Sequence, residues 1–239
     1  MLVSLDRVSE AMQYAQTKMT TMEQALAFSK ALVTEQNAQP EALAIAKRGL
    51  NLPGNCRHNL AAWMAEIAEE IGDTVTVIKG RVQAFQEEPS YPKYLKLEEL
   101  AGANWQNIKQ EVLAALAENT AWGAKTAKVN IYIYEGLINK AIPLVENLGY
   151  NKQSLVLKVM DAAMQTHPDW IIDNASQRAE AILSEGKAKY YGTTIKWLRR
   201  VRQAYIDNDR QSEWNEYRTE LVTIHARKRK FMSFMQNIV

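Results

Sequence analysis

Basic side chains near the end of the sequence have the types and the spacing that bind polyanions. Lys196, Arg199 and Arg200 recur at three- and four-residue spacing, and HARKRKFM contains four consecutive cations at 227–230. On one surface, the two groups could neutralise about four phosphates, and affinity would then fall roughly a hundredfold between about 50 and 200 mM salt. The candidate residues for binding a polyanion or an acidic partner are Lys196, Arg199, Arg200, Arg227 and Lys228.

A structural interpretation of the same residues is the one we favour. Consecutive positions spread around a helix axis, and the run 227–230 has no interleaved aromatic residues. The net charge of the whole chain is only +2, although residues 1–186 contain 17 Lys+Arg against 22 Asp+Glu and residues 187–239 contain 12 against 5. We therefore expect the run to cap and solubilise the end of the penultimate helix, where cations stabilise the helix dipole.

Thiol, metal and nucleotide chemistry have few candidate residues. Cys56 is the only cysteine, and His58 lies two residues after it in the turn NLPGNCRHN. A histidine can activate a thiolate, but two ligands in one loop do not form a four-ligand zinc site. His167 and His225 lie far from His58 in the sequence, and VIKGRV lacks the glycines and the Lys-Ser/Thr pair of a phosphate-binding loop. We expect structural roles for these residues, with no enzymatic activity, no cofactor and no metal.

The composition favours a cytoplasmic protein. A single cysteine excludes an internal disulfide and is typical of a reducing compartment. No run approaches the roughly 18 apolar residues that span a membrane, and Asp6 and Arg7 interrupt the apolar stretch that a signal peptide needs. We therefore expect no membrane partner.

Helices must position all of these residues, because apolar residues recur at three- and four-residue spacing along most of the chain. Helices are expected at 5–18 and 22–36, with Thr20 and Glu23 forming a capping box. Further starts and stops are expected at these residues: Pro40 in a first turn, Gly72 as a left-handed cap, Ser90 with Pro92 at a start, Gly102 at a stop, and Asn104 as an N-cap.

One segment is ambiguous, because Val129, Ile131 and Ile133 alternate as in a strand. We favour a helix, since an isolated short strand would leave its backbone groups without partners. The last third is clearer. Apolar stripes predict three helices, on these residues: Ile171, Ala175, Ala179 and Ile182; Tyr191, Ile195, Leu198, Val201 and Tyr205; Trp214, Tyr217, Leu221 and Ile224. Tryptophans within such stripes are expected to be packing anchors.

Helix pairs of roughly thirty-odd residues follow one another along the chain, and this period is typical of stacked helical hairpins. The strings AKVNIYIYEGLINKAI and AEAILSEGKAKYYGTTIKWL resemble tetratricopeptide units in their small residues and Glu-Gly turns. We therefore predict an all-α fold, an α-solenoid of about twelve to fourteen helices in antiparallel hairpins, as a single helical-repeat domain over residues 1–239.

Several strings in order resemble the C-terminal helical region of bacterial SWIM zinc finger proteins. They are EALAIAKRGLNL, YLKLEELAGANW, IYIYEGLINKAI, HPDW, GKAKYY, IKWLRRVRQAY, SEWNEYRTEL and HARKRKFM, and the similarity extends from about residue 40 to the end. Proteins of that family have a zinc module of cysteines and a histidine upstream, which this sequence lacks. The resemblance implies a helical interaction region and gives no zinc-binding role to Cys56 or His58.

The predicted function is a non-catalytic scaffold that binds another protein. The alternative is an accessory nucleic-acid-binding module that uses the basic hairpins within residues 187–239.

Overall fold

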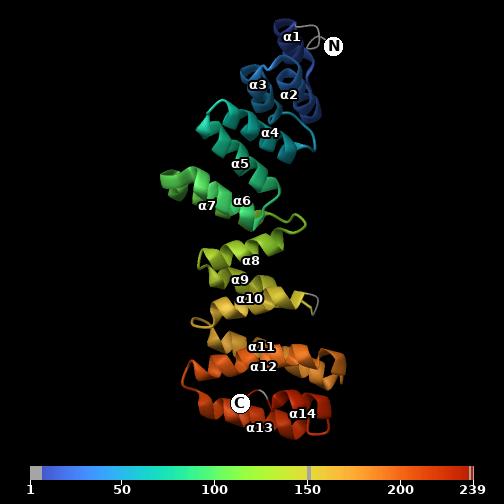
Figure 1. Ribbon diagram of the computed structural model, residues 1–239, viewed down its shortest axis with the longest axis vertical. Helices are drawn as coiled ribbons and strands as arrows, with labels where there is room; N and C mark the ends of the chain where they lie inside the picture. The colour runs from blue at the N-terminus through green and yellow to red at the C-terminus, as the bar shows by residue number, and fades with distance from the viewer. Residues whose placement is uncertain (1–6, 150–151, 237, 239) are drawn as a thin grey trace. The chain divides into compact units, whose positions relative to one another are not determined.

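The computed structural model describes residues 7–149, 152–236 and 238. Every regular element within these residues is a helix, and none of them is in a strand (Figure 1). The all-α prediction is confirmed. The chain falls into two compact units, Met1–Ile131 and Tyr132–Val239, which we call unit 1 and unit 2 and describe separately. That residues 1–239 form a single helical-repeat domain stays a prediction.

The helices follow one another with short connections. The described residues of unit 1 contain α1 (Val8–Lys18), α2 (Met22–Gln36), α3 (Gln39–Gly49), α4 (Arg57–Glu70), α5 (Thr74–Glu87), α6 (Tyr91–Ala101), α7 (Trp105–Glu118) and most of α8 (Ala124–Tyr134). Those of unit 2 contain α9 (Ile138–Val145), α10 (Gln153–Ala163), α11 (Pro168–Ser184), α12 (Tyr191–Ile206), α13 (Gln211–Ile224) and α14 (Arg229–Met235). Single 3₁₀ turns at Gly102–Asn104 and Ala188–Tyr190 precede α7 and α12.

The capping box of α2 lies one residue later than predicted. Thr21 is the N-cap, its hydroxyl accepts from the backbone N–H of Gln24 at 3.3 Å, and the Gln24 side chain accepts from the Thr21 N–H at 3.3 Å. The same glutamine oxygen also accepts from the Thr20 N–H at 2.8 Å. Gln24 therefore performs the role expected of Glu23, whose carboxylate accepts from a backbone N–H in the α3–α4 loop.

Most predicted helix ends are confirmed, and one cap is wrong. Pro40 lies in the first turn of α3, and Ser90 caps α6 by accepting from a backbone N–H. Gly72 after α4 and Gly102 after α6 both have positive φ, at 75° and 50°. Asn104 makes no side-chain cap to the α7 backbone, because its side-chain oxygen Oδ1 accepts instead from the Asn107 side-chain amide at 2.6 Å.

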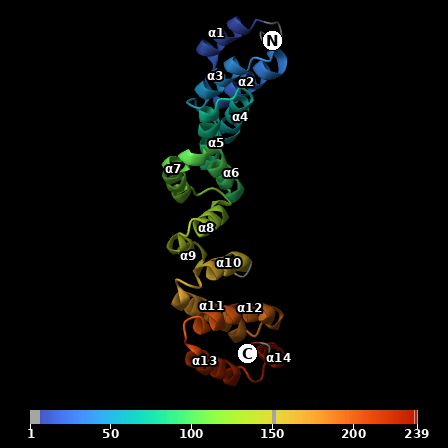
Figure 2. The same ribbon diagram turned by 60° about the vertical axis from the view of Figure 1, so that its left-hand side comes forward.

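Neighbouring helices form close pairs, with α2 on α3, α4 on α5 and α11 on α12 (Figures 1 and 2). Glycines allow two of these approaches. A Cβ on Gly80 of α5 would lie 2.7 Å from the Ala61 carbonyl oxygen of α4, and a Cβ on Gly49 of α3 would lie 2.3 Å from the Ala25 Cβ of α2. The helix α5 was not predicted, since Gly80 and several β-branched residues obscured its pattern.

The ambiguous segment is helical. Val129 and Ile131 are fully buried within α8, whereas Tyr134 at its last position is exposed. In unit 2 the predicted stripes of α11 and α12 are buried in full. Trp214 and Leu221 of α13 are buried as expected, but Ile224 is 65% exposed and does not belong to the core.

Candidate functional site

The basic residues of α12 lie on the side away from its buried stripe. Lys196 and Arg199 are exposed, and Arg200 is partly exposed. The Arg200 guanidinium makes two hydrogen bonds to Asp161 of α10, at 2.9 and 3.0 Å. Because this bidentate geometry satisfies both charges, Arg200 connects α10 to α12 and is less available to a partner than the other two.

Arg199 and Arg200 also line a shallow depression of about 240 Å³ on unit 2, together with Asp161, Met164 and Gln203. The Asp161 carboxylate belongs to the same depression, so positive charge there is partly neutralised. The depression is therefore a weaker anion site than the spacing of Lys196, Arg199 and Arg200 predicts.

The run 227–230 lies after the penultimate helix and partly within the last one. α13 ends at Ile224, and Lys228 is the N-cap of α14. Arg229 and Lys230 open the first turn of α14, where the positive end of the helix dipole disfavours cations. The expectation that the whole run stabilises the end of a helix through its dipole is therefore wrong for these two residues.

Aromatic packing holds the run against the start of α12. The ring of Phe231, next to Lys230, lies 6.0 Å from the ring of Tyr191 in an edge-to-face contact. Figures 1 and 2 show α12 and α14 side by side in unit 2, with the α11–α12 and α13–α14 turns at the same end. The contact between Tyr191 and Phe231 thus places the α11–α12 turn, which contains Lys187 and Lys189, at the same end of unit 2 as the α13–α14 turn.

The structure therefore divides the predicted binding residues into two groups. Lys196, Arg199 and Arg200 lie along α12 beside α10, whereas Arg227 and Lys228 lie in the α13–α14 turn. No hydrogen bond or ion pair of the described residues joins the two groups. Lys189 was not among the predicted residues, and the only sequence signal for it was the excess of basic residues that begins at 187.

Three other cations of unit 2, Lys187, Arg200 and Arg210, are paired with carboxylates, whereas those of the run are not. Lys187 pairs with Glu185 at 2.6 Å, and Arg210 pairs with Glu213 at 2.7 Å and with Asp169. Within the part of the chain that the structure describes, Arg227, Lys228, Arg229 and Lys230 have no acidic partner. All four are exposed or partly exposed.

His225 lies two residues before Arg227, the first residue of the run, and is buried. Its ring packs edge to face on Phe231 at 5.9 Å. Burial lowers the pKa of His225, the charge of Lys228 lowers it further, and the Glu180 carboxylate raises it. The histidine is thus part of the packing that supports the α13–α14 turn.

Cys56 and His58 point to different partners. The Cys56 thiol lies against the Glu23 carboxylate of α2, and burial followed by this negative charge raises the pKa of the thiol. The His58 Nδ1 lies 3.0 Å from the carbonyl oxygen of Ala84 in α5, and its Nε2 lies 3.3 Å from Glu88. A raised thiol pKa disfavours the thiolate that nucleophilic chemistry needs.

The third histidine also has structural contacts. The His167 Nε2 lies 2.7 Å from the Asn139 side-chain oxygen, and its Nδ1 lies 2.8 Å from the Thr166 hydroxyl. His167 is the N-cap residue of α11, and its contact with Asn139 connects this helix to α9. It does not lie in a group of metal-binding side chains, since the described residues contain no cluster of three or more His, Cys, Asp or Glu able to hold a metal ion.

Comparison with known proteins gives no further guide. No protein-family model matches the chain, and neither a curated protein nor a solved structure does. Among the described helices, none combines the length and the apolar character needed to cross a membrane.

Proposed function

We propose that the protein is a non-catalytic helical-repeat scaffold that binds another protein, with its helices stacked as antiparallel hairpins in an α-solenoid. The observation that carries this proposal is a recurring contact between each of several helices and the second helix after it. In such repeats one hairpin cannot bury its own apolar face, so that neighbouring hairpins must cover it.

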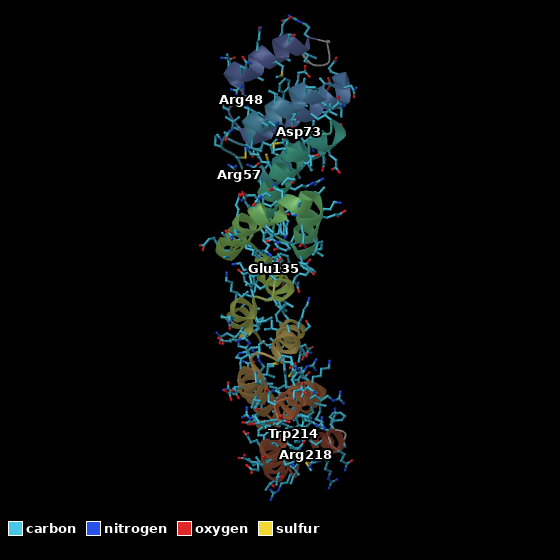
Figure 3. All side chains as sticks on the ribbon, turned by 90° about the vertical axis from the view of Figure 1, so that its left-hand side faces the viewer. Arg48, Arg57, Asp73, Glu135, Trp214 and Arg218 are labelled. Atoms are coloured by element: carbon cyan, nitrogen blue, oxygen red, sulfur yellow. The ribbon has the colours of Figure 1, made fainter. Side chains whose placement is uncertain are left out.

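In unit 1, Arg48 of α3 donates to the last turn of α1. Its guanidinium reaches the carbonyl oxygens of Ala15 at 3.1 Å and Gln16 at 2.7 Å, across sequence separations of 33 and 32 residues (Figure 3 labels Arg48). Carbonyl groups at the end of a helix have no partner within the helix, and a cation there also stabilises the dipole.

In unit 2, Arg178 of α11 makes the equivalent contact with the end of α9. It donates to the carbonyl oxygens of Val145 at 3.1 Å and Glu146 at 2.6 Å, again across 33 and 32 residues. Its guanidinium also lies 5.5 Å from the ring centre of Trp197 in α12. Because Arg48 and Arg178 use the same separations and the same helix spacing, the two contacts support a common structural repeat.

Two further contacts have nearly the same separation. The Trp63 indole N–H of α4 donates to the Ser29 hydroxyl of α2 at 2.8 Å, across 34 residues. The Asn119 side chain, which follows α7, donates to the carbonyl oxygen of Gln86 in α5 at 2.6 Å, across 33 residues. Contacts that recur with one period are typical of repeat proteins, whose units contact their neighbours.

The reactive side chains have contacts that support a structural role. Cys56 lies against Glu23, His58 and His167 bind oxygen atoms of neighbouring helices, and His225 packs on Phe231. A scaffold with exposed helix faces on both units fits these observations better than a catalytic centre. We keep a cytoplasmic location and the relation to the helical region of SWIM zinc finger proteins as parts of the same proposal.

Affinity capture from the native host, followed by reconstitution, tests the proposal. The tagged protein is expected to enrich at least one protein over a tagged unrelated helical-repeat bait, and the two purified proteins are expected to form a complex of defined stoichiometry by calorimetry. Failure to enrich any protein over the control bait, or failure of every enriched protein to bind in purified form, would contradict the scaffold function.

Nucleic-acid binding is the second candidate, and the unpaired cations at 227–230 are the observation that favours it. Titration with duplex and single-stranded DNA at about 50 mM salt tests it, because phosphate contacts make affinity fall steeply as salt is added. Absent binding, or binding indifferent to salt, excludes this candidate.

A further inference from the structure

A basic patch of unit 2 combines residues of two turns that are distant in the sequence. We infer that this patch docks an acidic segment of a partner protein. It consists of Lys189, Arg227, Lys228, Arg229 and Lys230, and we call it the basic end. The inference rests on the proposed scaffold function, since it names the chemistry of the partner that one of its surfaces binds.

Buried aromatic residues fix the geometry of the basic end. Phe231 is fully buried and contacts both Tyr191 at 6.0 Å and His225 at 5.9 Å. Lys189 lies two residues before Tyr191, and Lys230 directly precedes Phe231. The backbone of both turns is thus held by packing, and the cations project from a fixed base, which lowers the entropy that docking costs.

The cations of the basic end are not neutralised within unit 2. Lys189 lies over the ring of Tyr190 at 4.8 Å, and the run 227–230 has no acidic partner among the described residues. The acidic residue of the adjoining α11–α12 turn, Glu185, is already paired with Lys187 at 2.6 Å. A partner that supplies carboxylates would therefore form ion pairs that the free protein does not contain.

The arrangement also opposes the stability of the free protein. Four like charges follow one another, and Arg229 and Lys230 lie in the first turn of α14, where the dipole disfavours cations. Local arrangements that cost stability without a compensating contact are expected at functional sites. A carboxylate-bearing partner would relieve both the mutual repulsion and the unfavourable dipole interaction.

An acidic protein segment fits the basic end better than a nucleic acid. Bases bind single-strand sites by stacking on exposed aromatic rings. The rings that support the basic end, Tyr191 and Phe231, are 4% and 0% exposed and pack edge to face. The partly exposed ring of Tyr190 lies under the Lys189 ammonium group, 4.8 Å from its centre. Lysine and arginine, in contrast, make charge-assisted hydrogen bonds to the carboxylates of Asp and Glu in an extended segment.

Binding of a defined peptide to the full chain tests the inference. The probe is a fluorescent 12-residue peptide of alternating Asp and Glu, and its control is the same peptide with Asn and Gln. We expect the acidic peptide to bind, with an affinity that falls when salt is raised from about 50 to about 200 mM, and we expect no binding of the neutral peptide. Equal binding of the two peptides would contradict the inference.

Substitution places the binding at the basic end. The variant Lys228→Gln/Arg229→Gln/Lys230→Gln removes three cations that would form ion pairs with the bound peptide. Affinity for the acidic peptide is therefore expected to fall about tenfold. The matched control, Lys18→Gln/Lys79→Gln/Lys125→Gln, makes the same change in net charge with exposed lysines of unit 1 and is expected to bind as the wild type. Equal loss in both variants would reduce the effect to net charge and overturn the inference.

A stability measurement separates lost binding from lost folding. Because the substitutions relieve repulsion and the dipole conflict, the triple variant at the basic end is expected to keep or raise the melting temperature. If it unfolds instead, Lys189→Gln/Arg227→Gln removes charge outside α14 and is expected to weaken peptide binding as well; unchanged binding by this folded pair would overturn the inference.

Two competing occupants give different results. Tighter binding of single-stranded or duplex DNA than of the acidic peptide at the same salt would assign the basic end to nucleic acid. Self-association by sedimentation that the triple variant abolishes would assign it to a second copy of the chain. If a captured partner binds wild type and triple variant equally, the scaffold function stands and only the acidic docking fails. If no partner is captured but the acidic peptide binds at the basic end, the scaffold function fails and the recognition of carboxylates by the basic end stands.

Discussion

Basic side chains of unit 1 satisfy carbonyl groups at helix ends. Arg57, labelled in Figure 3, donates to the carbonyl oxygen of Leu50 at 2.9 Å, and Lys128 donates to that of Ala117 at 2.7 Å. Each such bond offsets the cost of a backbone acceptor without a partner. The cations at 227–230 of unit 2 have no acidic partner among the described residues. We therefore treat cations bound to helix-end carbonyl groups as structural and the cations at 227–230 as candidates for binding a partner.

His225 gives a pH dependence at the scale of one residue. Its pKa in the folded protein lies below its ordinary value of 6.5, because burial and Lys228 disfavour the charged ring. As the pH falls below about 6.5, the unfolded chain therefore binds the proton more readily than the folded one. We expect the free energy of unfolding in urea to be lower at pH 5.5 than at pH 7.5.

The variant His225→Gln is the control for this prediction. Carboxylates with lowered pKa values, such as Glu23 and Asp73, lose their contribution below their ordinary pKa values of 4.5 and 3.8, outside this window. We expect the substitution to reduce the difference in unfolding free energy between the two pH values, whatever it does to the absolute stability. An undiminished difference would assign the pH dependence to other groups.

At the scale of helix pairs, a glycine at the contact allows two helices to approach closely, and an alanine substitution tests this approach. Gly80→Ala places a Cβ 2.7 Å from the Ala61 carbonyl oxygen and 3.0 Å from the Ala65 Cβ, so that α4 and α5 must move apart. We expect a loss of about 1–3 kcal/mol in the free energy of unfolding, measured by urea denaturation. The gain of about 1 kcal/mol in helix propensity is too small to offset this loss in full.

Gly192→Ala in α12 is the matched substitution. Apart from the backbone of α12 itself and the adjacent residues, no described atom lies within 4 Å of the added Cβ, so that the change is expected to stabilise the protein by up to about 1 kcal/mol. If Gly80→Ala stabilised the protein, as Gly192→Ala is expected to do, the close approach of α4 and α5 would not exist in solution.

Local patterns predicted most helices but not the contacts between them. The stripe of Ile171, Ala175, Ala179 and Ile182 followed from spacing alone, because a helix buries one face. The helix α5 escaped prediction because Gly80 reads as an interruption until its partner α4 is known. Ile224 was placed in the core by spacing but is 65% exposed, since it lies beside Thr219 and Thr223 on the outer side of α13.

The candidate site was predicted in part for a similar reason. Four consecutive cations are visible in the sequence, but their position at the start of α14 depends on where α13 ends. Lys189 joins the run through the contact between Tyr191 and Phe231, and no local pattern predicts that two residues so far apart in the chain are neighbours. Contacts of this kind require the tertiary structure.

At the scale of the whole molecule, the proposed repeat makes stability local. In stacked repeats each hairpin contacts only its neighbours, so that opening free energies differ along the chain and a lost contact acts nearby. Arg48 in unit 1 and Arg178 in unit 2 make the same contact between a helix and the second helix after it. A substitution of Arg48 can therefore serve as the control for a substitution of Arg178, and the reverse.

Hydrogen exchange followed by mass spectrometry is the most direct test of this repeat. Arg48→Gln is expected to speed exchange in α1 and α3 and to leave α9 and α11 unchanged, while Arg178→Gln is expected to do the reverse. Uniform acceleration along the entire chain in either variant, or unchanged exchange in the helix whose carbonyl groups lost their arginine, would contradict the stacked-hairpin arrangement.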